Sequence, residues 1–495
     1  MNTKFGISLI IAGTLVLFSC KKSDLASTGD TSETTGWAYN SEENGGFEVV
    51  TQYEEQTPPG CVFIEGGTFT MGRVEQDVNF DWNNQPRRVS VSSFYLDETE
   101  VRNVDYREYL FWLKRVFAEY PAVYKNALPD TLVWRSKLAY NEPYVEYYFR
   151  HPAYNQYPVV GVNWIQANDY CAWRSDRVNE KIMIDNGYLK MDPQQSGAEN
   201  FNTDAYLVGQ YDGLPGENPK LSPMGVERKI TLEDGLLLPK YRLPTEAEWE
   251  FAAFSLIGNS FDERIYERRL FPWNGHTLRN DDAKSRGQMR ANFVRGRGDY
   301  MGTAGDLNDN ADVPAPVKSY WPNDYGLYCM AGNVSEWVMD VYRPLTQEDN
   351  DEFRPFRGNV FMEMERDNDG NVAPKDSLGR IKFKPVDPAN AANRRNYKQA
   401  DYRNYLDGDV QSSLDFSTST TSAQNPGGST RMYAQGQGDM SSLITDNVRV
   451  YKGGSWKDRA YWLVPGTRRF LNETDSRDDI GFRCAMTRVG SPKGF

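Results

Sequence analysis

Two long stretches of this sequence, residues 281–312 and 349–446, are rich in glycine, asparagine and aspartate and show no regular spacing of apolar residues. Neither the 3.6-residue period of an amphipathic helix nor the alternation of a half-buried strand runs through them. Structureless segments of this length are uncommon in compact domains, so loops must be part of the architecture. The sequence therefore predicts an α+β fold that is loop-rich and has little regular secondary structure.

The apolar residues available for a core are largely aromatic. The 495-residue chain contains 30 Tyr, 24 Phe and 12 Trp, together with 41 Gly and 26 Pro. This composition favours a domain held by aromatic packing and turns over a helical bundle. The length suits one large domain or two to three of average size.

Strands are predicted in the first third of the chain. The runs 62–64 and 68–71 flank Glu65-Gly66-Gly67, a turn sequence, and this arrangement predicts a β-hairpin. Alternating apolar residues over 89–96 and the short apolar run 158–162 predict two further strands.

Three helices are predicted from start signals and apolar spacing. One follows residue 99 and ends near Phe117. A second begins at Asn163, and a third begins after Thr245, an N-cap residue with Glu248 three positions later, as in a capping box. The first helix has one apolar face, formed by Tyr106, Leu110, Leu113 and Phe117.

Residues 1–19 have the pattern of an export signal, with Lys4 before an apolar run shorter than the about 20 residues of a membrane-spanning helix. Leu17-Phe18-Ser19-Cys20 resembles a lipoprotein cleavage site, so we expect Cys20 to be lipidated and to anchor the protein. A plain cleaved signal with an incidental cysteine is the alternative. Because no acidic run follows Cys20, we expect the protein to lie on the periplasmic face of the outer membrane.

Residues 20–57, rich in Ser, Thr, Gly and Glu, predict a flexible tether.

Charge and histidine content exclude several functions. A formal net charge of −13 argues against nucleic acid as the main partner, because phosphate contacts need a basic surface. The two histidines, His151 and His276, exclude a three-histidine metal site and disfavour a serine–histidine–aspartate triad.

Four cysteines follow Cys20, and they have no C-x-x-C spacing, so a zinc site is not predicted. Three full disulfide connectivities and burial as free thiols all stay open. These cysteines are Cys61, Cys171, Cys329 and Cys484.

Short motifs follow one another in a fixed order over residues 58–490, which we expect to form one domain. In this order they resemble the formylglycine-generating-enzyme (sulfatase-modifying factor) family, and the resemblance implies that family's loop-rich, C-type-lectin-like fold. Each motif alone is weak, but their collinearity is specific. The motifs are residues 66–72, 97–101, 158–162, 242–250, 271–275, 326–328, 332–337, 453–456 and 481–485.

Compared with the family, the spacing shows two large insertions, at about residues 174–240 and 343–448. Loops on a common core usually carry specificity, and inert loops of this length are unusual. We therefore expect the insertions to bind partners, with inert embellishment as the alternative.

The resemblance implies copper chemistry for which this chain lacks the ligands. The family's enzymes oxidise a substrate cysteine with O₂ on copper held by two cysteines, and copper(I) prefers such thiolates. Aligned on Gly453-Gly454-Ser455, the two positions fall on Asp458 and Leu463. Iron-dependent relatives need three histidines, and this chain has two. We therefore expect a pseudoenzyme without catalytic or cofactor-binding residues.

The resemblance also implies calcium at two places. One set of ligands would be Asn292, Phe293 and Asp306; the other would be Gly332, Val334 and Glu336. Calcium needs six to eight oxygen ligands. Cys329 stands where the second site would need an oxygen-bearing side chain, which weakens that site. Solvated acidic loops are the alternative explanation of these residues.

A lipoprotein with this fold and an inactive site resembles the GldJ- and GldK-like lipoproteins of gliding motility and type IX protein secretion. The resemblance implies a structural role on the periplasmic side of the outer membrane, with a sister GldK-like lipoprotein and a periplasmic ring protein as partners. Two alternatives stay open: an enzyme with an altered active site around Asp458, and a module that binds glycans or peptides. The local features that carry the resemblance are residues 35–37, 81–84, 130–135, 150–152 and 157–162.

Overall fold

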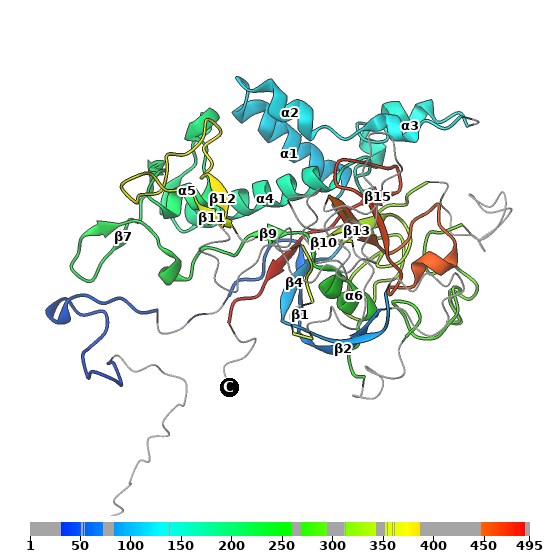
Figure 1. The fold of residues 1–495 in the computed structure, drawn as a ribbon, viewed down its shortest axis with the longest axis horizontal. Helices are drawn as coiled ribbons and strands as arrows, with labels where there is room; N and C mark the ends of the chain where they lie inside the picture. Colours follow the sequence, from blue (N-terminus) through cyan, green and yellow to red (C-terminus); the bar gives the residue numbers. More distant parts are fainter. Residues whose placement is uncertain are drawn as a thin grey trace, which may run out of the picture.

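The protein is described from a computed structural model, and two four-stranded sheets form its centre (Figure 1). The predicted export signal and Cys20 lie outside the described residues, so both stay predictions. Within the described residues, no helix combines the length and the apolar character needed to cross a bilayer. The structure describes residues 31–50, 53, 55–72, 84–137, 139–259, 269–294, 311, 313–342, 352–353, 355–358, 360, 362–386 and 447–490.

The first sheet joins segments from both ends of the domain. Its strand order is β1-β4-β16-β9, and all pairs are antiparallel. Leu96 pairs with Val62 on one side and with Ala485 on the other, so β4 lies between the first strand and the last motif. The strands are β1 (Cys61–Ile64), β4 (Phe94–Asp97), β16 (Ala485–Thr487) and β9 (Tyr241–Arg242).

The second sheet carries the motifs around which the candidate site is built. Its order is β14-β13-β10-β15; β10 runs parallel to β15, whereas the other pairs are antiparallel. Glu336 lies opposite Lys452 in the β10–β13 register. The strands are β14 (Arg469–Asn472), β13 (Val448–Lys452), β10 (Ser335–Val341) and β15 (Ile480–Gly481).

The predicted hairpin over residues 62–71 is wrong. β1 pairs with β4, and β2 (Gly67–Met71) pairs with β3 (Arg87–Val91). Phe69 of β2 is fully buried with its ring 5.2 Å from that of Phe251, so burial against a helix outweighs the local turn signal. The chain bends tightly at Gly66, where a Cβ would lie 2.4 Å from the Val91 carbonyl oxygen.

Two other strand predictions also change. The run 89–96 divides at Ser92–Ser93 into the end of β3 and most of β4, which belong to different sheets. Residues 158–162 form a single bridge, between Pro158 and Arg102, in place of a strand. Proline has no amide hydrogen to donate to a ladder, which limits pairing there.

The three predicted helices are confirmed, and their caps have the expected geometry. In α4 (Trp164–Asp185) the side chain of Asn163 accepts from the Gln166 amide, and in α6 (Glu246–Phe254) Thr245 accepts from Glu248. The remaining α-helices are α1 (Asn103–Val116), α2 (Pro121–Ala127), α3 (Glu142–Tyr147) and α5 (Thr203–Leu207). Single-turn helices are η1 (Glu42–Asn44), η2 (Thr131–Trp134), η3 (Pro152–Tyr154), η4 (Gly197–Glu199), η5 (Leu232–Asp234) and η10 (Ala460–Leu463).

Aromatic side chains fill the space between α1, α4 and the sheets, as the composition predicted. Tyr106 of α1 and Tyr170 of α4 lie nearly parallel, 5.6 Å apart, and Phe482 packs edge-on against Tyr170. The predicted apolar face of the first helix is buried throughout, from Tyr106 to Phe117. Burying each such side chain contributes roughly 1.5–3 kcal/mol.

The two predicted insertions share a small core of their own. α4 continues past Trp173 to Asp185, and beyond it Phe201 and Tyr206 pack with Ile381 of the second insertion. In Figure 1 this lobe, with α5, β11 and β12, lies at one end of α4. Its strand pairs are β5 (Leu189–Lys190) with β6 (Leu214–Pro215), β7 (Lys220–Leu221) with β8 (Glu227–Arg228), and β11 (Met362–Met364) with β12 (Phe383–Pro385).

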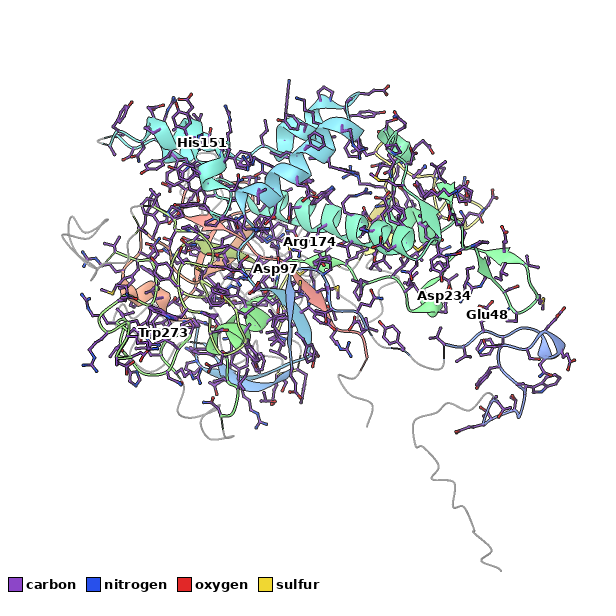
Figure 2. The ribbon with its side chains drawn as sticks, turned by 180° about the vertical axis from the view of Figure 1, so that it is seen from behind. Glu48, Asp97, His151, Arg174, Asp234 and Trp273 are labelled. Atoms are coloured by element: carbon purple, nitrogen blue, oxygen red, sulfur yellow. The ribbon has the colours of Figure 1, made fainter. Side chains whose placement is uncertain are left out.

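The segment before the domain contacts the same lobe. Arg228 forms ion pairs with both Glu48 and Asp234, and Glu48 and Asp234 lie close together in Figure 2. Nearer the domain, Glu55 accepts hydrogen bonds from Arg488 and Tyr95. The predicted tether boundary at residue 57 and the predicted insertion boundaries stay predictions.

Candidate functional site

The segment after β13 turns sharply at two glycines. Gly453 and Gly454 have φ angles of 94° and 68°, which non-glycine residues rarely adopt. A Cβ on Gly454 would lie 2.8 Å from the Trp462 carbonyl oxygen, so the turn also needs a close backbone approach. The turn buries Ser455 fully and places its hydroxyl within hydrogen-bonding distance of Asp458.

An ion pair fills the first position to which the family resemblance assigns a copper ligand. Arg469 of β14 donates to both carboxylate oxygens of Asp458, at 2.7 and 2.6 Å. The Ser455 hydroxyl donates to the same carboxylate at 2.7 Å, and Arg469 also donates to Ser335 at 3.0 Å. Such a bidentate pair satisfies the carboxylate and offers neither a soft ligand nor a free base.

The second position is part of a hydrophobic core. Leu463, at the end of η10, is fully buried and packs in a cluster with Phe271, Phe293 and Ala331. Its side chain carries no group that could bind a metal or transfer electrons. The structure therefore gives both predicted positions structural contacts.

Glu336, a predicted calcium ligand, is bound to an arginine. Arg483 donates to both of its carboxylate oxygens at 2.6 Å, and Trp249 Nε1 donates at 2.7 Å. A carboxylate already paired with a buried cation does not fit a calcium ligand. Gly332 and Val334 flank it in the buried backbone, where Gly332 donates its amide to Gly453.

The other predicted calcium site is only partly described. Asn292 is buried, and its side-chain amide donates to the Val313 carbonyl at 3.0 Å, while Phe293 packs in the core beside Leu463. Asp306 lies outside the described residues. In the described part of the chain, no three His, Cys, Asp or Glu side chains form a metal-binding group. Calcium at either place stays a prediction.

Sequence reasoning missed Glu100, which lies beside this centre. Asn333 donates to one of its oxygens at 3.0 Å, and the other has no hydrogen-bond partner among the residues that the structure describes. Burial raises the pKa of Glu100 to about 8, even though Arg483 lowers it. In the sequence, Glu100 looks like an ordinary residue near a predicted helix start. Its burial depends on segments that are distant in the chain, so no local pattern indicated it.

A second charged cluster was also missed. Lys452, fully buried, donates to Glu246 at 3.2 Å and to Glu250 at 3.0 Å, and Arg468 donates to Glu246 at 2.7 Å. Burial raises the pKa of the neighbouring Asp340 to about 7, although the backbone amides that donate to it lower the pKa. The balanced charges make this cluster a structural connection between α6 and β13.

The cysteines lie in three environments. Cys171 and Cys484 are fully buried with their sulfurs 3.3 Å apart, and Cys61 contacts the Asp97 carboxylate at 3.3 Å. Arg174 pairs with Asp97 at 2.7 Å, and Figure 2 shows both labelled near the middle of the molecule. All four cysteines after Cys20 are free thiols in the structure. Cys329, also buried, lies 3.5 Å from the Val317 carbonyl oxygen.

The two histidines lie apart from this centre. His151 caps η3 by accepting from the Ala153 amide, and it appears near the surface in Figure 2. His276 is exposed. Neither contacts Asp458, so the structure places no histidine base at the position of the predicted copper ligands.

The sequence matches a family and several characterised proteins. The profile of the sulfatase-modifying factor enzyme 1-like domain matches residues 46–488. Mouse formylglycine-generating enzyme is 24% identical over 300 residues, which are 56% of this chain and 57% of that protein. Mouse inactive C-alpha-formylglycine-generating enzyme 2 is 24% identical over 314 residues, 59% of this chain and 71% of that protein.

Among solved structures, PvdO from Pseudomonas aeruginosa is 16% identical and covers 86% of this chain and 94% of its own, with a TM-score of 0.39. The family thus includes both enzymes and members named inactive. Because the family profile spans most of the chain, this protein belongs to the sulfatase-modifying factor enzyme 1-like domain family.

Proposed function

We propose that this protein is a non-catalytic member of its family. One observation carries the proposal: Asp458 is neutralised by Arg469, and Leu463 is buried in a hydrophobic core. Oxidation of a thiol on copper(I) needs soft ligands that hold the metal, and neither residue supplies one. The inactive mouse relative is consistent with such a member.

Catalysis is tested directly with the purified full-length protein. A peptide bearing a cysteine within a sulfatase-type recognition sequence would be incubated with the protein, copper and O₂, and conversion of the cysteine to an aldehyde would be followed by mass spectrometry. We expect no conversion above the rate without protein. Turnover that disappears in Asp458→Asn would overturn the proposal and support the alternative of an altered active site.

We further propose that the protein is an outer-membrane lipoprotein of the GldJ type, anchored through Cys20 on the periplasmic face. Its role would be structural, within the machinery of type IX secretion and gliding motility. The motif order, the lipoprotein-like Leu17-Phe18-Ser19-Cys20 and the lobe built by the two insertions support this assignment. Partners would be a GldK-like sister lipoprotein and a periplasmic ring protein.

The localisation and the assembly need separate tests. Replacement of Cys20 by serine should release the protein from the outer-membrane fraction, whereas Cys61→Ser should leave it there. Complexes purified from gently solubilised membranes should contain the protein with stoichiometric secretion subunits. Recovery of the membrane-bound protein as a monomer would contradict the scaffold role while leaving the anchor intact.

A further inference from the structure

A pocket of about 280 Å³ opens where the family core meets both insertions. α1 and α4 supply one side, with Leu113, Phe117 and Trp173. Asn202 of the first insertion and Arg380 of the second supply the other side. The pocket therefore depends on segments that distinguish this chain from more compact relatives.

The walls from the insertions are held in place by hydrogen bonds. Asn200 donates to the Leu378 carbonyl at 2.8 Å, which ties the first insertion to the second. Asn202 donates to Asp176 at 3.0 Å and caps α5 through the Ala205 amide. These contacts give the pocket a defined shape before any ligand binds.

Asp169 is the one carboxylate of the pocket with no partner among the described residues. It lies on α4, on the same face as Trp173 and Asp176, which are four and seven residues further along the helix. Asp176 is satisfied, because the Thr203 amide and Asn202 donate to it. Asp169 is exposed to solvent, yet the protein around it raises its pKa.

Arg380, the arginine of the pocket, pairs with a carboxylate other than Asp169. Arg380 lines the pocket, but its Nε donates to Asp376 at 3.3 Å, and 58% of its side chain is exposed. It lowers the pKa of Asp169 without forming an ion pair with it. The carboxylate thus lines the same pocket as aromatic rings and forms no ion pair with the described residues.

We propose that this pocket binds an ammonium or guanidinium group carried on an apolar stem, as in a lysine or arginine side chain or a free alkylamine. The stem would lie along Phe117 and Trp173, and the head group would reach Asp169. The volume is just below the range of about 300–1,000 Å³ of drug-sized sites, so it suits a single such group. The net charge of −13 favours approach of a cation.

The inference goes beyond the scaffold role and does not depend on it. It is tested by ligand-observed NMR titration of the full-length protein with three probes: Nα-acetyl-lysine N-methylamide, cadaverine and Nα-acetyl-norleucine N-methylamide. We expect the lysine probe to bind about tenfold or more tightly than the neutral norleucine probe, because a charge-assisted hydrogen bond is worth about that factor. Tighter binding of cadaverine would point to a free amine, and tighter binding of the capped lysine to a polypeptide.

Two variants and a control make the test specific. Asp169→Asn should weaken binding of the lysine and cadaverine probes about tenfold while leaving that of the norleucine probe unchanged. Ala172→Phe should block all three probes, because Ala172 lines the pocket and is exposed. Asp185→Asn, on the same helix but paired with Lys181, is the matched control. Equal binding of lysine and norleucine probes, or wild-type affinity in Asp169→Asn, would overturn the inference.

Discussion

Ion pairs hold two regions of this molecule together, and the two sets differ in how far solvent reaches them. At the centre, Arg483 and Lys452 are 0% exposed and pair with buried glutamates. At the edge, Arg228 is 24% exposed where it joins Glu48 to Asp234. Buried pairs are costly to form and very costly to break, whereas exposed pairs contribute little. The same chemistry should therefore fix the fold at the centre and only position a segment at the edge.

The largest effect should come from Arg483→Met. Removal of the guanidinium leaves Glu336 buried without its cation, which costs about 3–5 kcal/mol. Urea unfolding followed by fluorescence measures the loss, and Arg135→Met, at a pair of which each side chain is more than half exposed, is the control. If Glu336→Leu combined with Arg483→Met fails to recover stability, lost packing and not the unpaired charge explains the defect.

A disulfide between Cys171 and Cys484 should have the next largest effect. Their sulfurs are 3.3 Å apart, so oxidation of the two thiols by oxidised glutathione should join them and release two equivalents of glutathione. The crosslink should stabilise the protein by about 2–4 kcal/mol. Peptide mapping without reduction checks the connectivity, and a bond from Cys61 to either partner would contradict it.

Glu100→Gln should change the pH dependence of stability. Because burial raises the pKa of Glu100 to about 8, the folded state favours the protonated carboxyl. That contribution is fully present below the unfolded pKa near 4.5 and is lost as pH rises through about 8. Between pH 5 and pH 9, the free energy of unfolding should therefore fall by about 1–3 kcal/mol less in the variant than in the wild type. Glu98→Gln, at an exposed position, should behave as the wild type.

The smallest effect should come from Glu48→Gln, which leaves the pair of Arg228 with Asp234 in place. The exposed pair with Glu48 contributes at most about 1 kcal/mol, and salt should screen it. The hydrogen bond from Arg228 lowers the pKa of Glu48, so its contribution is present at neutral pH and lost in acid. Limited proteolysis before residue 50 should be faster in the variant. A fall of more than about 2 kcal/mol in the free energy of unfolding would show that the pair of Arg228 with Glu48 stabilises the fold as the central pairs do.

Local signals were readable from the sequence, whereas long-range ones were not. The cap at Thr245 depends on Glu248, three positions later, and was predicted correctly, as was the start of a helix at Asn163. The pairing of β1 with β4 joins residues at least thirty positions apart, so a nearby glycine turn suggested the wrong partner. The loop-rich character was predicted from the long segments without apolar periodicity, whereas the family's fold was predicted through the collinear motifs.

The family resemblance pointed to two residues of the candidate site, but the sequence did not show their surroundings. Alignment on the glycine turn placed Asp458 and Leu463, but Arg469 as the partner of Asp458 depends on strand β14 lying alongside β13. Lys452 and Glu250 look like ordinary strand and helix residues until α6 packs over β13. Burial of charge arises from tertiary packing, which no short pattern encodes.

The bidentate contact of Arg469 with Asp458 also bears on how such a protein could change over generations. Substitution of cysteines at positions 458 and 463 would leave the guanidinium facing Ser335 and Trp462 without its counter-ion, and would cut a cavity where Leu463 packs. Each single substitution would lower stability before any metal chemistry could arise. The arrangement thus makes a copper site at these two positions costly to build one residue at a time.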